Sequence, residues 1–297
     1  MNHPLRRVAS ALTGIFALLV MVHLTRAAEL RIVGSDLLGL DFSKTIYGFG
    51  VREGVSIAVA LDGSRPGFDE LKAGRADLAL LTLPPGDEPD PATFESLALA
   101  WHRVVVIVPV GAPLERVTFD QLRGIFSADA PLTFTRWSDL GLTGEWAEQL
   151  IAPLAPANGL GLAGEIVRHV ALRGSAYRPQ TLRYTSMSDL GQRLAGDTRS
   201  IALAATMPAG LSSHRVLPVA AQARDPGFLP TPENLHSGDY PLSLSLRIVF
   251  RRDGPAKLVP LIYFLLGDEV ADAIQRTDIV PATQPVRRQQ LLMLGKK

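Results

Sequence analysis

The chain of 297 residues contains no cysteine. A disulfide framework, a thiolate metal site, a cysteine nucleophile and a lipid-modified cysteine are therefore excluded. An excess of charge of either sign is also lacking, because 30 Lys and Arg residues stand against 29 Asp and Glu residues. This balance gives no reason to expect nucleic-acid binding, but it is silent about small ligands, whose sites depend on local charge.

Signatures of catalysis and of metal binding are missing as well. The sequence has no G-x-S-x-G nucleophile elbow, and its histidines are scattered without a metal-ligand spacing. Residues 159–164 match the dinucleotide pattern G-x-G-x-x-G, but Pro153 and Pro156 interrupt the preceding segment. The region 178–183, where an acidic residue should follow, is basic. We therefore expect no enzyme activity, no metal and no cofactor.

The composition is that of a folded protein. Apolar residues make up 47% and charged residues 20% of the chain, which is enough to bury a large core and excludes wholesale disorder. The length suggests about two domains of ordinary size. Beyond the first segment, no run is long and apolar enough to span a bilayer, and we find neither an internal repeat nor a low-complexity tract.

Residues 1–27 have the pattern of a secretory signal peptide. Arg6 and Arg7 give it a positive start, residues 11–24 are mostly apolar, and small residues allow cleavage after Ala27 or Ala28. The alternative is an uncleaved anchor, although the run is short for a span of about 20 residues. Cleavage after Ala27 removes three arginines and no acid, which leaves a net charge of −2. We predict an exported, periplasmic protein that is free rather than lipid-tethered.

Apolar strands alternate with helix signals along the rest of the chain. The predicted strands are 30–33, 55–61, 76–83, 97–110, 200–205 and 243–250. The predicted helices are 68–73, 118–126, 164–172, 190–194, 256–266, 267–275 and 284–294. Thr118 and Ser186 are expected to cap helices, and Pro260 is expected to kink the helix that contains it. Such near-continuous apolar strands separated by helices favour an α/β fold with a parallel sheet.

Several of these pieces follow one another in a familiar order. They are Gly34-Ser35, the turn 63–67, the stretch 71–84, the stretch 104–127 running into Trp137-Ser138-Asp139, and Tyr240-Pro241-Leu242-Ser243. This order resembles the periplasmic phosphate-binding proteins of phosphate ABC importers, which have the type II periplasmic-binding-protein fold. The resemblance extends from about residue 30 to about residue 292, and the chain is a divergent member by this comparison.

The resemblance implies a two-lobed α/β fold. Each lobe is expected to hold a mostly parallel sheet flanked by helices, with two crossover strands at the hinge. Residues 28–109 and 214–297 would form the first lobe, and residues 110–213 the second. A small oxyanion, phosphate or a related ion, would bind in the cleft between the lobes. The expected partner is an ABC permease in the inner membrane, and the expected state is a monomer.

The residues themselves support an anion site. Gly34-Ser35, Gly63-Ser64 and Asn158-Gly159 each precede a segment that is plausible as a helix, whose first turn would offer unpaired N–H groups and the positive end of the helix dipole. Serine hydroxyls add donors, and Arg65 could add a bidentate charged one. The candidate ligand-binding residues are Gly34, Ser35, Asp36, Gly63, Ser64, Arg65, Thr82, Asn158 and Gly159.

Two departures from the family bear on the ligand. Thr82 occupies the place of the acidic residue that accepts a hydrogen bond from protonated phosphate. The region 155–161 lacks both the arginine and the Ser-Gly-Thr helix start of the family, and a lost charged contact weakens binding by about 1.5–3 kcal/mol. Asp36 or Arg65 could compensate, or the ligand could be another oxyanion, a neutral molecule or none. Two hypotheses remain: a binding protein of an oxyanion importer, or a periplasmic sensor or accessory domain that has lost the site.

Overall fold

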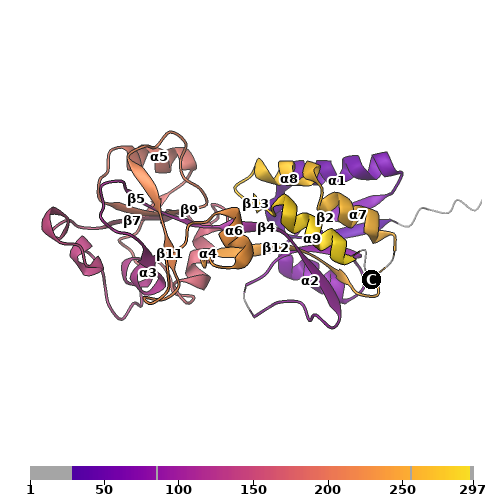
Figure 1. Ribbon diagram of the computed structural model, residues 1–297, viewed down its shortest axis with the longest axis horizontal. Helices are drawn as coiled ribbons and strands as arrows, with labels where there is room; N and C mark the ends of the chain where they lie inside the picture. Colours follow the sequence, from indigo (N-terminus) through magenta and orange to yellow (C-terminus); the bar gives the residue numbers. More distant parts are fainter. Residues whose placement is uncertain (1–28, 85, 255, 295–297) are drawn as a thin grey trace, which may run out of the picture.

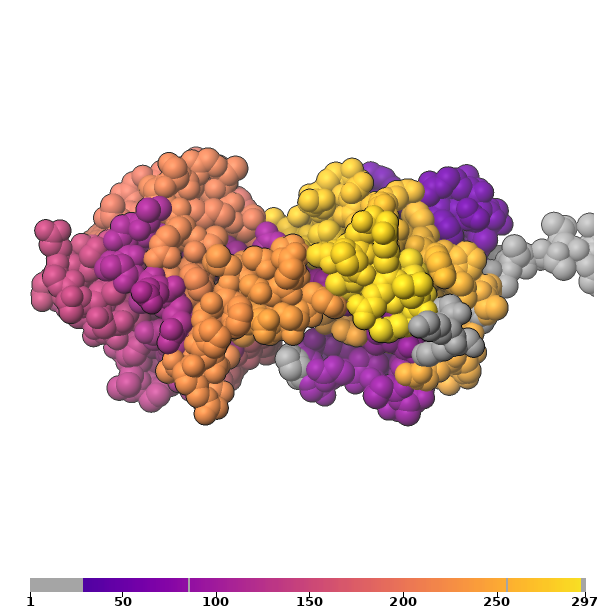
Figure 2. Space-filling view, in the orientation of Figure 1, coloured from indigo at the N-terminus to yellow at the C-terminus, as the bar shows by residue number. Residues whose placement is uncertain are grey.

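The computed structural model describes residues 29–84, 86–254 and 256–294. The predicted signal peptide and both of its cleavage positions lie outside the described residues. Two lobes lie side by side along the long axis of the molecule, with a narrow waist between them (Figures 1 and 2). Among the described residues, no helix combines the length and the apolar character needed to cross a bilayer.

The first lobe is built on a six-stranded sheet with the order β13-β4-β12-β3-β1-β2. Its strands are β1 (Leu30–Gly34), β2 (Ile57–Ala60), β3 (Leu78–Thr82), β4 (Phe94–Arg103), β12 (Ser243–Arg251) and β13 (Val280–Pro281). Its helices are the 3-10 turn η1 (Asp36–Leu38), α1 (Gly39–Glu53), α2 (Ser64–Lys72), α7 (Leu258–Leu265), α8 (Asp268–Gln275) and α9 (Gln284–Leu294). Apolar side chains of β1, β3 and β12 pack with those of α1, α7 and α8 in one buried cluster.

The second lobe holds a five-stranded sheet with the order β10-β5-β9-β7-β8 and a two-stranded sheet of β11 and β6. Its strands are β5 (Val105–Pro109), β6 (Val117–Thr118), β7 (Ala152–Pro156), β8 (Leu182–Tyr184), β9 (Ser200–Ala204), β10 (His214–Leu217) and β11 (Val219–Ala220). Its helices are α3 (Phe119–Phe126), α4 (Ala163–Val170), α5 (Met187–Ala195), α6 (Pro232–Ser237) and the 3-10 turns η2 (Trp137–Leu140) and η3 (Gly144–Trp146).

The two-lobed α/β fold expected from the sequence is confirmed, with one refinement to the sheets. Both sheets are mixed rather than mostly parallel. In the first, β1 pairs in parallel with β2 and β3, whereas β12 is antiparallel to β3 and β4. In the second, β7 is parallel to β8 and β9, whereas β5 is antiparallel to β9 and β10. The antiparallel pairs arise where the chain crosses between the lobes and returns.

The chain crosses between the lobes at Val104 and again at Leu242. The long apolar run predicted at 97–110 is β4 in one sheet and β5 in the other, and Val104 N donates to Leu242 O at 3.0 Å. Sheet membership therefore assigns β5 and β10 to the second lobe, although the boundaries expected at 109 and 214 leave both strands in the first. The reason is that a single, mostly apolar run, broken only by His102 and Arg103, serves both sheets, so its apolar character does not mark the crossing.

Local signals in the sequence account for several helix starts. Thr118 Oγ1 accepts from Gln121 N at 3.2 Å and Gln121 Oε1 accepts from Thr118 N at 2.9 Å, which completes the expected capping box of α3. Ser186 caps α5 as expected, at 3.0 Å from Asp189 N. Pro260 lies in the first turn of α7, where a proline costs no helical hydrogen bond, so the expected kink does not follow. The segment 208–238, predicted without long elements, holds the short β10, β11 and α6.

Candidate functional site: the cleft between the lobes

Three loops meet at one edge of the first sheet. They follow β1, β2 and β3, whose parallel pairing brings their carboxyl ends to the same side. Gly63 N donates to Gly34 O at 2.8 Å, which joins the first two loops. Thr82 N donates to Ser64 Oγ at 2.9 Å, which joins the second and the third. The chain thus holds the amino-terminal end of α2 directly against the ends of β1 and β3.

This contact depends on glycine at two positions. Gly34 has φ +135°, and a Cβ there would lie 2.1 Å from Leu80 O. A Cβ on Gly67 would lie 2.6 Å from the Cα of Gly34. The backbones of α2 and β1 therefore touch without any side chain between them, and the first turn of α2 is fixed at the mouth of the cleft.

Three hydroxyl groups converge in this region. The side chain of Ser35 accepts from Leu37 N at 3.4 Å, and the residue is 1% exposed. Ser64 Oγ likewise accepts a backbone N–H, so each serine retains its O–H hydrogen for donation. Thr82 Oγ1 is buried and has no hydrogen-bond partner in the described part of the chain. Together with the first turn of α2, these hydroxyls form a half-site suited to an oxyanion.

The charges on this wall are mixed. Arg65 lines the cleft, but its guanidinium forms an ion pair with Asp87 in a largely exposed position. Asp36 lies in the first turn of η1 and also lines the cleft. Asp87 therefore compensates part of the charge of Arg65, and the Arg65 guanidinium is not a free cation beside the hydroxyls.

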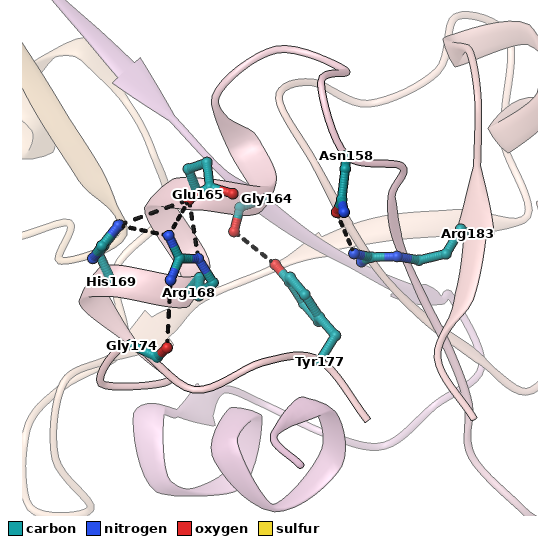
Figure 3. Close-up of polar contacts among 8 residues, drawn as sticks. All are labelled: Asn158, Gly164, Glu165, Arg168, His169, Gly174, Tyr177 and Arg183. Atoms are coloured by element: carbon teal, nitrogen blue, oxygen red, sulfur yellow. Dashed lines mark hydrogen bonds and ion pairs between the residues drawn. The ribbon is translucent and has the colours of Figure 1, made fainter. Parts of the chain in front are cut away.

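The opposite wall is one face of α4 in the second lobe. Leu162, Ile166 and Val170, spaced four residues apart, face a cavity of about 780 Å³ together with Glu165 and His169. Figure 3 shows Glu165 held by Arg168, with Glu165 Oε2 2.6 Å from Arg168 Nη2 and 3.7 Å from His169 Nε2. This wall is apolar with one compensated carboxylate, so it offers far fewer hydrogen-bond donors to the cleft than the first lobe does.

The structure separates the predicted residues into two groups. Ser35, Asp36, Ser64, Arg65 and Thr82 line the cleft, with the backbones of Gly34 and Gly63 joining the loops behind them. Asn158 and Gly159 lie elsewhere, in a second cavity within the second lobe. The order of motifs along the chain assigned all nine residues to one site, because it does not show that the loop 157–161 faces this other cavity.

Other cleft residues were missed from the sequence. Glu165 and His169 belong to no sequence motif, although the i, i+4 spacing of Leu162, Ile166 and Val170 could have indicated a helix face.

A cavity of about 270 Å³ beside the cleft shares Leu37 and Ile166 with it and reaches Arg103 and Asp278. Burial lowers the pKa of Arg103, and Asp278 opposes this shift. No group of three or more His, Asp or Glu residues that could hold a metal occurs within 29–84, 86–254 and 256–294.

A two-lobed α/β protein with hydroxyl donors and a helix end at the inter-lobe cleft belongs to the class of periplasmic-type solute-binding folds. The sequence profile of the PBP superfamily domain matches residues 23–269, and the chain belongs to this superfamily. By sequence, no curated protein matches it.

Solved structures with the same fold include proteins named for phosphate. A possible phosphate binding protein from Planctomyces limnophilus DSM 3776 superposes with TM-score 0.69 at 19% identity, over 91% of this chain and 99% of that one. An ABC-type phosphate transport receptor from Vibrio cholerae gives 0.61 at 20%, over 84% and 99%. PstS from Borrelia burgdorferi gives 0.71 at 14%, over 86% and 99%. The resemblance inferred from the sequence is thus confirmed for the superfamily and the fold.

Proposed function

We propose that this protein is an exported solute-binding protein that binds phosphate or a related small oxyanion in the inter-lobe cleft. The observation that carries the proposal is the convergence of the Ser35, Ser64 and Thr82 hydroxyls at the first turn of α2. In this role the protein is a monomer without catalysis or cofactor, and its closed form docks on an ABC permease. The names of the structural neighbours support an oxyanion as the ligand.

Hinge closure would complete the site. The hydroxyls and the helix end supply donors, whereas Asp36 and Glu165 supply acceptors. An oxyanion that keeps a proton, such as hydrogen phosphate, can use both kinds of group, because its hydroxyl donates to a carboxylate while its other oxygens accept. A fully ionised anion such as sulfate can use only the donors. We therefore expect phosphate to bind more tightly than sulfate.

The test is calorimetry on the purified mature chain with phosphate, sulfate and related oxyanions. Ser64→Ala removes one donor and should weaken phosphate binding by about 5- to 10-fold. Ser188→Ala is the matched control, because Ser188 is an exposed serine on α5 in the other lobe. Absence of heat and of a thermal shift with every oxyanion would refute the proposal, as would equal affinity of the two variants.

A second candidate function also has an observation behind it. Arg65 is paired with Asp87, and the α4 wall is largely apolar, as expected for a sensor or accessory domain of the same fold that has lost its phosphate site. Asp87→Asn separates the two roles. In a binding protein it frees Arg65 for the cleft and should tighten phosphate binding, whereas in a domain without a phosphate site it leaves the lack of binding unchanged.

A further inference from the structure

A second cavity lies inside the second lobe, on the other side of α4 from the cleft. It measures about 570 Å³, within the size range of small-molecule sites. Its walls are the loop 157–161, the face of α4 that carries Gly164, Glu165 and Arg168, and the segment 176–183 that leads into β8. Glu165 borders both this cavity and the cleft, whereas the hydroxyls of the first lobe border only the cleft.

Arg183 is the central cation of this cavity. Its guanidinium lies 4.3 Å from the centre of the Tyr177 ring, and its Nη2 donates to Asn158 Oδ1 at 3.0 Å (Figure 3). Tyr177 is itself fixed by a 2.9 Å hydrogen bond from its hydroxyl to Gly164 O. The guanidinium is therefore held flat in one orientation before any ligand arrives.

One edge of that guanidinium has no partner. Nη1 of Arg183 is buried and makes no hydrogen bond within the described residues, nor does Arg183 pair with a carboxylate there. A buried charged N–H without a partner is costly, and such groups in native proteins usually bond to an ion, a water or a ligand. Thr181, which is 6% exposed, also lines this cavity, and its Oγ1 is likewise buried and without a hydrogen-bond partner among the described residues.

The remaining charges leave the cavity positive. Arg168 is compensated by Glu165 at 2.6 Å. Arg178 bonds only to a backbone carbonyl, that of Phe134 at 3.3 Å, and burial lowers the pKa of its guanidinium. Two arginines, Arg178 and Arg183, therefore lack a carboxylate partner in the described part of the chain, and a ligand of opposite charge would supply one.

We propose that this cavity is a second anion site, which binds the phosphate or carboxylate group of a small organic anion through Arg183, Thr181 and Arg178. The volume admits a molecule larger than inorganic phosphate, and the flat guanidinium suits the two oxygens of either group. The site is independent of the cleft, because none of these three side chains lines the cleft.

The test is calorimetry at low salt with inorganic phosphate, glycerol 3-phosphate and succinate as probes. The last two distinguish a phosphate from a carboxylate ligand. Arg183→Gln should weaken the probe that binds here by about 10- to 100-fold. Thr181→Val keeps the shape of the side chain and removes only the unpartnered hydroxyl, so it should weaken binding while leaving the fold intact. Ser64→Ala, in the cleft, should leave this binding unchanged.

Arg199→Gln is the control for loss of one positive charge in the same lobe. Arg199 is largely exposed, immediately precedes β9 and accepts a hydrogen bond from Ala152 N at the start of β7, and it is not among the residues that line the cavity. The proposal is overturned if no probe binds below about 10 mM at low salt. It is also overturned if Arg183→Gln and Thr181→Val bind every probe as the Arg199→Gln control does, or if Ser64→Ala abolishes all binding.

Discussion

Replacing Gly67 by alanine tests the close contact of α2 and β1, because packing and helix propensity change the free energy of unfolding in opposite directions at this position. In an ordinary helix interior, alanine is more favourable than glycine by about 1 kcal/mol. Here the new Cβ would lie 2.6 Å from Gly34 Cα and 2.7 Å from Gly34 N, both of them backbone atoms that no rotamer change can move. Overpacking of this kind costs about 1–3 kcal/mol, so we expect a net loss of stability.

Gly191→Ala is the matched control for Gly67→Ala. Gly191 also lies within a helix, α5, but its Cβ would meet only Pro208 Cβ, at an ordinary 3.5 Å. The net loss of up to about 2 kcal/mol should lower the Tm of Gly67→Ala by up to about 8 °C in thermal unfolding, whereas the Tm of Gly191→Ala should be unchanged or raised.

Phosphate binding gives a second measurement on the same variant. To relieve the contact, α2 must move away from β1, which lengthens the 2.9 Å bond between Thr82 N and Ser64 Oγ and disperses the three hydroxyls. Gly67→Ala should therefore also weaken phosphate binding. If Gly67→Ala were as stable as Gly191→Ala, the close contact of α2 and β1 would be refuted.

Two further predictions concern the strands near the crossing. The Tyr240 hydroxyl donates to Val104 O where the chain passes between the lobes, so Tyr240→Phe should lower the free energy of unfolding by about 1–2 kcal/mol in urea titrations; an unchanged value would contradict this role. Burial lowers the pKa of His102 from 6.5 to about 4. Between pH 6.5 and pH 4 the imidazole is protonated in the unfolded chain but neutral in the folded chain. The free energy of unfolding is therefore highest above pH 6.5 and falls as the pH is lowered towards 4. Between pH 7 and pH 4.5 this loss amounts to about 2–3 kcal/mol, and His102→Leu should remove it from the difference measured by urea unfolding; equal losses in both proteins would count against it.

Local rules predicted most of the elements that shape the cleft. Apolar runs located β1, β2 and β3, and the glycines at the ends of β1 and β2 located the turns before η1 and α2. The capping residues Thr118 and Ser186 behave as expected because a helix start is decided within four residues. Such features depend on short-range backbone chemistry, which the sequence contains in full.

Contacts over long distances in the chain could not be predicted in this way. The pairing of Arg65 with Asp87 changes the expected role of that arginine, and only the folded loops bring the two side chains together. The division of the run 97–110 between two sheets depends on where Leu242 returns to meet Val104, 138 residues later in the chain.

The sequence by itself determined that this chain is an α/β protein without cysteine chemistry, and that glycine and serine turns precede its helices. Those properties follow from composition and local periodicity. The tertiary structure alone decided which turns share a site. It joined Ser35, Ser64 and Thr82 at the cleft and placed Asn158 beside Arg183 in a separate cavity. The physical reason is that strand order and the packing of α4, rather than position along the chain, set which side chains face the same space.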